Sequence, residues 1–115
     1  MNAHVVPAHP DADLLALGND LLNAWQAERA AFRASGDDFV ADQAIISASD
    51  NCQAIASQIV MLTPKTLDGV RVLAMVWGHA YYLSESPGEY EGADSDYPCE
   101  RAANAVMSFL LKDVA

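Results

Sequence analysis

Apolar residues recur every three or four positions over most of the chain, which is the period of an amphipathic α-helix. The first such stretch predicts a helix over residues 11–34. Asp11 is expected to cap its start and Gly36 to end it. Gly18 lies inside this helix, where it either allows close approach of a neighbouring helix or is simply tolerated. The apolar positions are Leu14, Leu15, Leu17, Leu21, Leu22, Trp25 and Phe32.

A second helix is expected over residues 38–62, and the short connection between the two predicts an antiparallel hairpin. Thr63-Pro64 then marks a break, and Thr66 offers an N-cap for a third helix over residues 66–83. That helix is apolar nearly all round, which is typical of a central helix or of one that faces a second protein chain. The apolar positions of the second helix are Ile45, Ala48, Cys52, Ile55, Ile59 and Leu62.

Residues 84–97 form the one long loop expected, and Pro87-Gly88 is a turn signal within it. A fourth helix is expected from about residue 96 to about 114. Its apolar positions are Ala102, Ala103, Val106, Met107, Phe109, Leu110 and Leu111. Because no stretch alternates as a strand does, we predict an all-α fold, a small antiparallel bundle of about four helices. Residues 11–115 form its single domain, after a flexible N-terminal tail over residues 1–10.

Composition narrows the class of function. The 115 residues are 52% hydrophobic, which excludes general disorder. They carry 16 acidic and 6 basic residues, a formal charge of -10, so too few cations are present to neutralise nucleic-acid phosphates or an anionic membrane. No apolar run reaches the ~18 residues of a membrane span, and the first residues lack a signal-peptide pattern. A soluble cytoplasmic protein is expected.

No reactive constellation stands out. Cys52 and Cys99 form no CxxC pair, His4 and His9 lie in the tail, and Glu-x-x-His and phosphate-binding motifs are absent. His79 is expected to bond a carboxylate or carbonyl, and Glu28 to be solvated or salt-bridged. We therefore expect no catalytic residue, metal or cofactor, and a protein that is not an enzyme.

Three functional hypotheses remain. The first is an acidic interaction or accessory protein that docks on a basic protein surface. Its binding residues are expected to be Glu85, Glu89, Tyr90, Glu91, Asp94, Asp96 and Tyr97. The second is a small-ligand binder or enzyme with a pocket near Trp77, His79, Tyr81 and Tyr82. The third is a structural homodimer, formed through residues 66–83, without a separate site.

Two stretches carry a resemblance to a known group. Residues 59–74 contain Pro64-x-Thr66-Leu67-x-Gly69, and residues 100–113 contain an alanine-rich helix that ends in Leu-Leu-Lys-Asp. Together they resemble small all-helical proteins of alphaproteobacteria and their mobile elements, whose function is not established. The resemblance implies a helical fold and an association with a prophage or mobile element, and it implies no activity.

Overall fold

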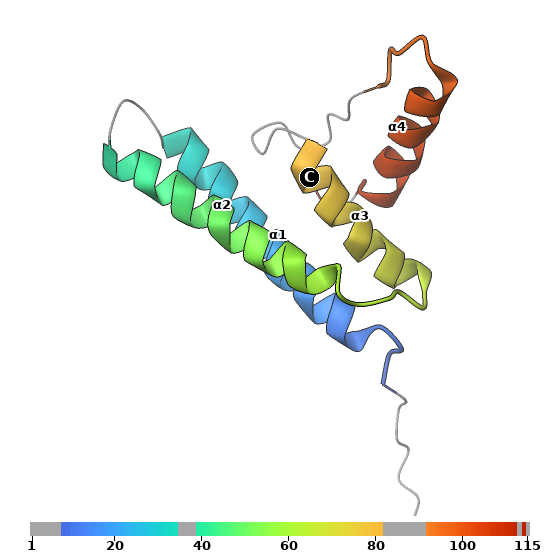
Figure 1. Ribbon diagram of the computed structural model, residues 1–115, viewed down its shortest axis with the longest axis horizontal. Coiled ribbons are helices and arrows are strands. Elements are labelled where there is room, and N and C mark those ends of the chain that lie inside the picture. The colour runs from blue at the N-terminus through green and yellow to red at the C-terminus, as the bar shows by residue number, and fades with distance from the viewer. Residues whose placement is uncertain (1–7, 35–38, 82–91, 113, 115) are drawn as a thin grey trace, which may run out of the picture.

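The computed structural model describes residues 8–34, 39–81, 92–112 and 114, with the backbone alone at 39–41 and 81. These residues form four helices and no strand, which confirms the predicted all-α class. The helices are α1 (Ala12–Ala34), α2 (Phe39–Ile59), α3 (Leu67–Tyr81) and α4 (Pro98–Leu110) (Figure 1). None of them is long and apolar enough to cross a bilayer.

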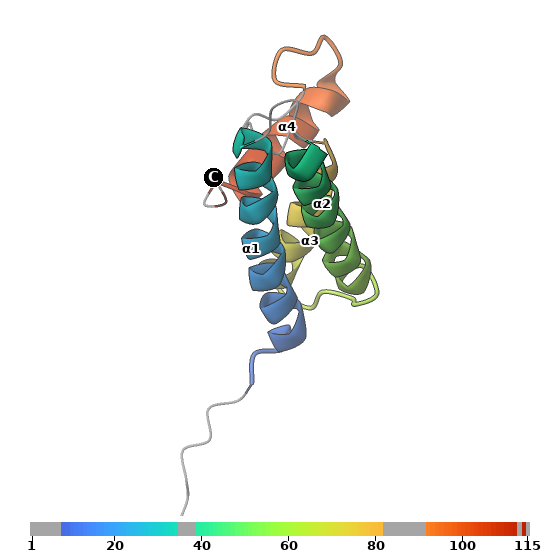
Figure 2. The same ribbon diagram turned by 90° about the vertical axis from the view of Figure 1, so that its left-hand side faces the viewer.

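Helices α1 and α2 run antiparallel as a hairpin, and α3 lies against that hairpin (Figures 1 and 2). The core is centred on α1, where Leu14, Leu21 and Trp25 are at most 1% exposed. Cys52 and Ile59 of α2 are fully buried against them. The apolar stripes predicted from the sequence therefore face one another, as the hydrophobic effect requires.

Gly18 lies where α1 meets α3. A Cβ atom built on Gly18 would lie 2.8 Å from Cγ2 of Val72, closer than two carbon atoms pack. Of the two explanations that the sequence left open for this glycine, the close approach of a helix is the one that the structure supports. The absent side chain sets the distance between α1 and α3.

The start of α3 is tied to the start of α1 through Asp11. The Asp11 carboxylate accepts hydrogen bonds from the backbone N–H of Lys65 (3.0 Å) and of Thr66 (2.8 Å), and from the Thr66 hydroxyl (2.6 Å). The Thr66 hydroxyl accepts in turn from the Gly69 N–H (3.2 Å), so Thr66 is the predicted N-cap of α3. Asp11 was expected to cap α1 with its side chain. The side chain instead accepts hydrogen bonds from Lys65 and Thr66, which lie 54 and 55 residues further along the chain.

Helix α4 stands apart from the hairpin and, among the described helices, contacts α3 alone (Figure 1). The Arg71 Nε–H donates to the Leu110 carbonyl (3.0 Å), and Leu111 and Val114, which follow α4, reach the core. No residue within α4 itself is buried. The fourth helix is thus held at its C-terminal end and leaves most of its surface uncovered.

Replacing Gly18 tests the contact between α1 and α3. Alanine would gain about 1 kcal/mol of helix propensity but would lose roughly 1–3 kcal/mol to overpacking against Val72. We expect Gly18→Ala to lower the free energy of unfolding in the wild type and to raise it by about 1 kcal/mol in a Val72→Ala background. Urea unfolding of the four proteins of this double-mutant cycle measures the change of sign, and equal effects in both backgrounds would contradict it.

Asp11 should make the fold sensitive to acid. The Thr66 hydroxyl, helped by the N–H groups of Lys65 and Thr66, lowers the pKa of Asp11 below its ordinary 3.8, although burial acts the other way. Because the folded pKa is the lower one, this stabilisation is complete well above pH 3.8 and is lost as the pH falls through 3.8 to the folded pKa. We expect Asp11→Asn to lower Tm at neutral pH and to reduce the fall of Tm in acid. Asp20→Asn removes an exposed carboxylate of α1 and is the matched control.

Candidate functional site

Each of the first three helices contributes one polar, chemically versatile side chain to a single point in the core. These residues are Glu28 of α1, Cys52 of α2 and His79 of α3, and their ligand-type atoms all lie within 4.8 Å of one another. The His79 Nε2 and Glu28 Oε1 atoms are 3.0 Å apart, and these two side chains are 8% and 3% exposed. Cys52 is fully buried. We call these three residues the core cluster.

The positions of these residues follow from the same periodicity that builds the core. Glu28 comes seven residues after the buried Leu21, and His79 comes seven after the buried Val72. Seven residues are close to two helical turns, so both side chains lie on the core-facing stripes of their helices. Cys52 occupies the centre of the apolar stripe of α2. The three stripes converge, and their polar members therefore meet.

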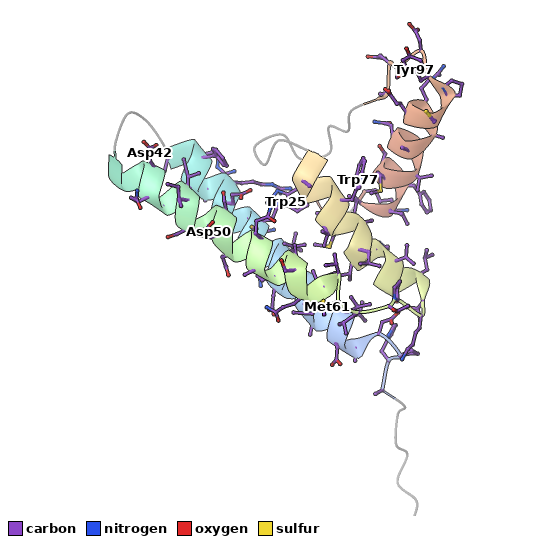
Figure 3. The ribbon with its side chains drawn as sticks, in the orientation of Figure 1. Trp25, Asp42, Asp50, Met61, Trp77 and Tyr97 are labelled. Atoms are coloured by element: carbon purple, nitrogen blue, oxygen red, sulfur yellow. The ribbon has the colours of Figure 1, made fainter. Side chains whose placement is uncertain are left out.

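The Trp25 side chain of α1 lies on the side toward α3 (Figure 3). Its ring meets the His79 ring edge to face, with centroids 5.4 Å apart and planes at 86°, which places it beside the core cluster. The Arg29 guanidinium lies over the Trp25 ring, 4.4 Å from its centroid. The indole Nε1–H is buried and has no hydrogen-bond acceptor among the residues that the structure describes. A buried donor without an acceptor is unusual in a folded protein.

The electrostatic setting keeps the cysteine protonated. Burial raises the pKa of the Cys52 thiol to about 11, and the nearby Glu28 carboxylate adds to this effect. Since the thiolate is the nucleophilic form, Cys52 is not an activated nucleophile at neutral pH in this arrangement. What the arrangement offers is a set of carboxylate, thiol and imidazole groups, all of which can bind a metal ion.

His79 was expected to bond a carboxylate or carbonyl, and it lies within hydrogen-bond distance of the Glu28 carboxylate, which is therefore paired and not solvated. The structure does not bring Trp77 and His79 together. Side chains two residues apart on an α-helix point about 200° apart around its axis. Trp77 accordingly lies on the side of α3 that faces α4 (Figure 3). The Tyr81 side chain and Tyr82 lie outside the described residues.

The described surface includes two cavities that lie away from the core cluster. One, of about 350 Å³, lies between α1, α3 and the segment after α4, and its lining includes Leu15, Arg71 and Met75. The other, of about 320 Å³, lies at the junction around Asp11 and Lys65. Neither is lined by Trp77 or His79. The pocket hypothesized around those residues stays a prediction.

The acidic face predicted from the sequence is described only in part. Glu85, Glu89, Tyr90 and Glu91 lie outside the described residues. The other three predicted residues, Asp94, Asp96 and Tyr97, are exposed and lead directly into α4. The Tyr97 side chain is free of the core, with 66% of the residue exposed. This acidic segment therefore adjoins the uncovered surface of α4.

Sequence reasoning missed the core cluster as a unit, since its members are 24 and 27 positions apart and form no motif. A signal was present, because Cys52 lies on a predicted apolar stripe and Glu28 and His79 continue the stripes of their helices. Comparisons with protein-family models, curated proteins and solved structures found no match to this chain. Functional inference therefore depends on the geometry described above.

The two cysteines should differ sharply in reactivity. Cys99 is exposed at the start of α4, whereas Cys52 is buried with a raised thiol pKa. We expect an aromatic disulfide reagent at mildly alkaline pH to modify Cys99 rapidly and Cys52 only after denaturation. The stoichiometry of the released chromophore, with and without denaturant, measures this. In Cys99→Ser no rapid phase should remain, and a rapid phase in that variant would contradict the burial of Cys52.

Proposed function

We propose that this chain is a non-enzymatic interaction protein that docks on a basic partner protein through α4 and the acidic segment before it. One observation carries the proposal: α4 is the most strongly amphipathic of the four helices, yet it has no buried residue. An amphipathic helix gains its stability by burying its apolar face, so an uncovered one is typical of a helix that completes its packing on a partner.

The uncovered apolar face is continuous along α4. Cys99, Ala102, Val106 and Phe109 follow one another at intervals of three and four residues, and all are exposed. Val106 is 54% and Phe109 65% exposed, although Lys112 Nζ lies 4.8 Å from the centre of the Phe109 ring. The helix instead packs against its neighbours through the side that carries the half-buried Met107 and the buried Leu111 beyond its end. We call the exposed residues Cys99, Ala102, Val106 and Phe109 the α4 stripe.

The charge around the α4 stripe indicates the chemistry of the partner. Asp94, Asp96 and Glu100 are exposed at the N-terminal end of α4, where the helix dipole favours acidic groups. The exposed Tyr97 among them supplies apolar area at low conformational cost. An apolar groove bordered by lysine or arginine residues complements this surface. The attraction increases the association rate most at low ionic strength.

A second copy of the chain is the competing occupant of the α4 stripe. Each copy has a formal charge of -10, so self-association brings like charges together. A basic partner is attracted by the same negative charge. The net charge therefore favours a different protein over a second copy, and the oligomeric state in solution separates the two.

Affinity capture with matched variants tests the proposal. The immobilised chain, incubated at low salt with a lysate of the organism that encodes it, should retain a basic protein that high salt releases. Val106→Ser combined with Phe109→Ser should weaken retention of that same protein by at least about tenfold, as expected when anchor residues of an interface are lost. Asp94→Asn with Asp96→Asn should weaken it at low salt only.

Ile46→Ser is the control, because Ile46 is also exposed, at 52%, but lies on α2. It should retain the partner as the wild type does. Light scattering should give 12.3 kDa for the purified chain. Retention that is unaffected by the α4 substitutions, or a dimer that those substitutions dissociate, would overturn the proposal.

A further inference from the structure

The core cluster contains three of the side-chain types that proteins use to hold transition metals. We infer that Glu28, Cys52 and His79 form a binding site for one thiophilic divalent cation of the zinc type. The docking role of α4 neither requires nor supplies this site. The inference starts from the fact that α1, α2 and α3 each supply one ligand-type atom, and that these atoms lie within 4.8 Å of one another.

The spacing suits a four-coordinate ion. With metal–ligand distances of about 2.0–2.3 Å, the donor atoms of a tetrahedral site are roughly 3.3–3.7 Å apart. His79 Nε2 and Glu28 Oε1, at 3.0 Å, are already slightly closer than that. All three donor atoms lie within 4.8 Å of one another, so no pair is more than about 1 Å beyond the spacing of a tetrahedral site. The ligands also come from packed helices, which hold them more firmly than loops would.

The donor set selects the class of ion. Sulfur and imidazole ligands favour zinc and similar transition metals, whereas calcium and magnesium take oxygen ligands in greater number. Binding displaces the proton of the Cys52 thiol to the solvent, because the thiolate is the ligand. The cation also neutralises the buried Glu28 carboxylate. Three protein ligands leave a fourth position for water or an exogenous group.

Trp25 supplies a second, independent observation. It is 1% exposed, it contacts His79, and its Nε1–H has no hydrogen-bond acceptor among the described residues. Leaving such a donor unsatisfied destabilises the folded state. A water or hydroxide carried into this part of the core by a cation is an acceptor of the kind that this donor lacks.

An ion pair without a metal is the competing explanation. It accounts for Glu28 and His79, which are 3.0 Å apart, but gives no role to the thiol of Cys52 or to the unsatisfied indole N–H. A cation site gives a common role to the carboxylate, the thiol and the imidazole. The two explanations differ in one measurable respect: only the cation site creates a bond between the metal and the sulfur of Cys52.

Cobalt reports that bond directly. The chain of 115 residues is first treated with a chelator and then titrated with Co²⁺, which adopts the same coordination as Zn²⁺ and absorbs visible light. We expect one equivalent to give the d–d bands of a tetrahedral ion and a sulfur-to-cobalt charge-transfer band, both removed by Zn²⁺. One equivalent of Zn²⁺ should also raise Tm, since it binds the folded state, and an excess of Mg²⁺ should not.

The two cysteines provide matched variants. Cys99→Ser should keep the spectrum, the stoichiometry and the shift in Tm. Cys52→Ser should lose the charge-transfer band. Cys52→Ser, Glu28→Gln and His79→Gln should each bind Zn²⁺ more than about 100-fold more weakly than the wild type. If Cys52→Ser fails to fold, the wild-type cobalt spectrum still decides. Absence of a charge-transfer band in the wild type, or its dependence on Cys99, would overturn the inference.

Discussion

The burial of one face of α1 is the constraint on which the rest of the structure depends. Leu14, Gly18, Leu21, Trp25 and Glu28 follow one another along that face, and all are buried. A single helix in water cannot cover such a face, so α2 and α3 must pack on either side of it. The close contact between α1 and α3 lies on this face, because it is made at Gly18. The core cluster lies on it too, because Glu28 belongs to the same face.

The junction before α3 fixes how that helix meets α1. The Asp11 carboxylate accepts hydrogen bonds from the Lys65 and Thr66 N–H groups and from the Thr66 hydroxyl, at the start of α3 where a helix leaves its own N–H groups without partners. A Cβ atom on Gly69 would collide with this carboxylate, so a larger residue here would push Asp11 away from Thr66. Thr66 and Gly69 of the Pro-x-Thr-Leu-x-Gly pattern therefore have a physical role in this chain: they accommodate the carboxylate of Asp11 from the start of α1.

The helices were predictable because periodicity and capping are local properties, and Leu14, Leu21 and Trp25 of the predicted α1 stripe are buried. Three features could not be predicted from the sequence, because each depends on contacts between residues that are distant along the chain. Asp11 was assigned to α1 although its carboxylate serves Thr66. The exposure of Phe109 depends on which side of α4 meets α3, which the pattern of α4 alone does not determine. The meeting of Glu28, Cys52 and His79 required the packing of three helices to be known.

The interior cluster and the exterior stripe are connected through α3. One side of this helix places His79 against Glu28, and another side faces α4 near Trp77 (Figure 3). Among the described helices α4 contacts α3 alone, so the position of the α4 stripe depends on that of α3. A cation that bound His79 together with Glu28 and Cys52 would fix α3 on the hairpin. It would thereby also fix the surface from which α4 presents its uncovered face, since packed helices move as rigid elements.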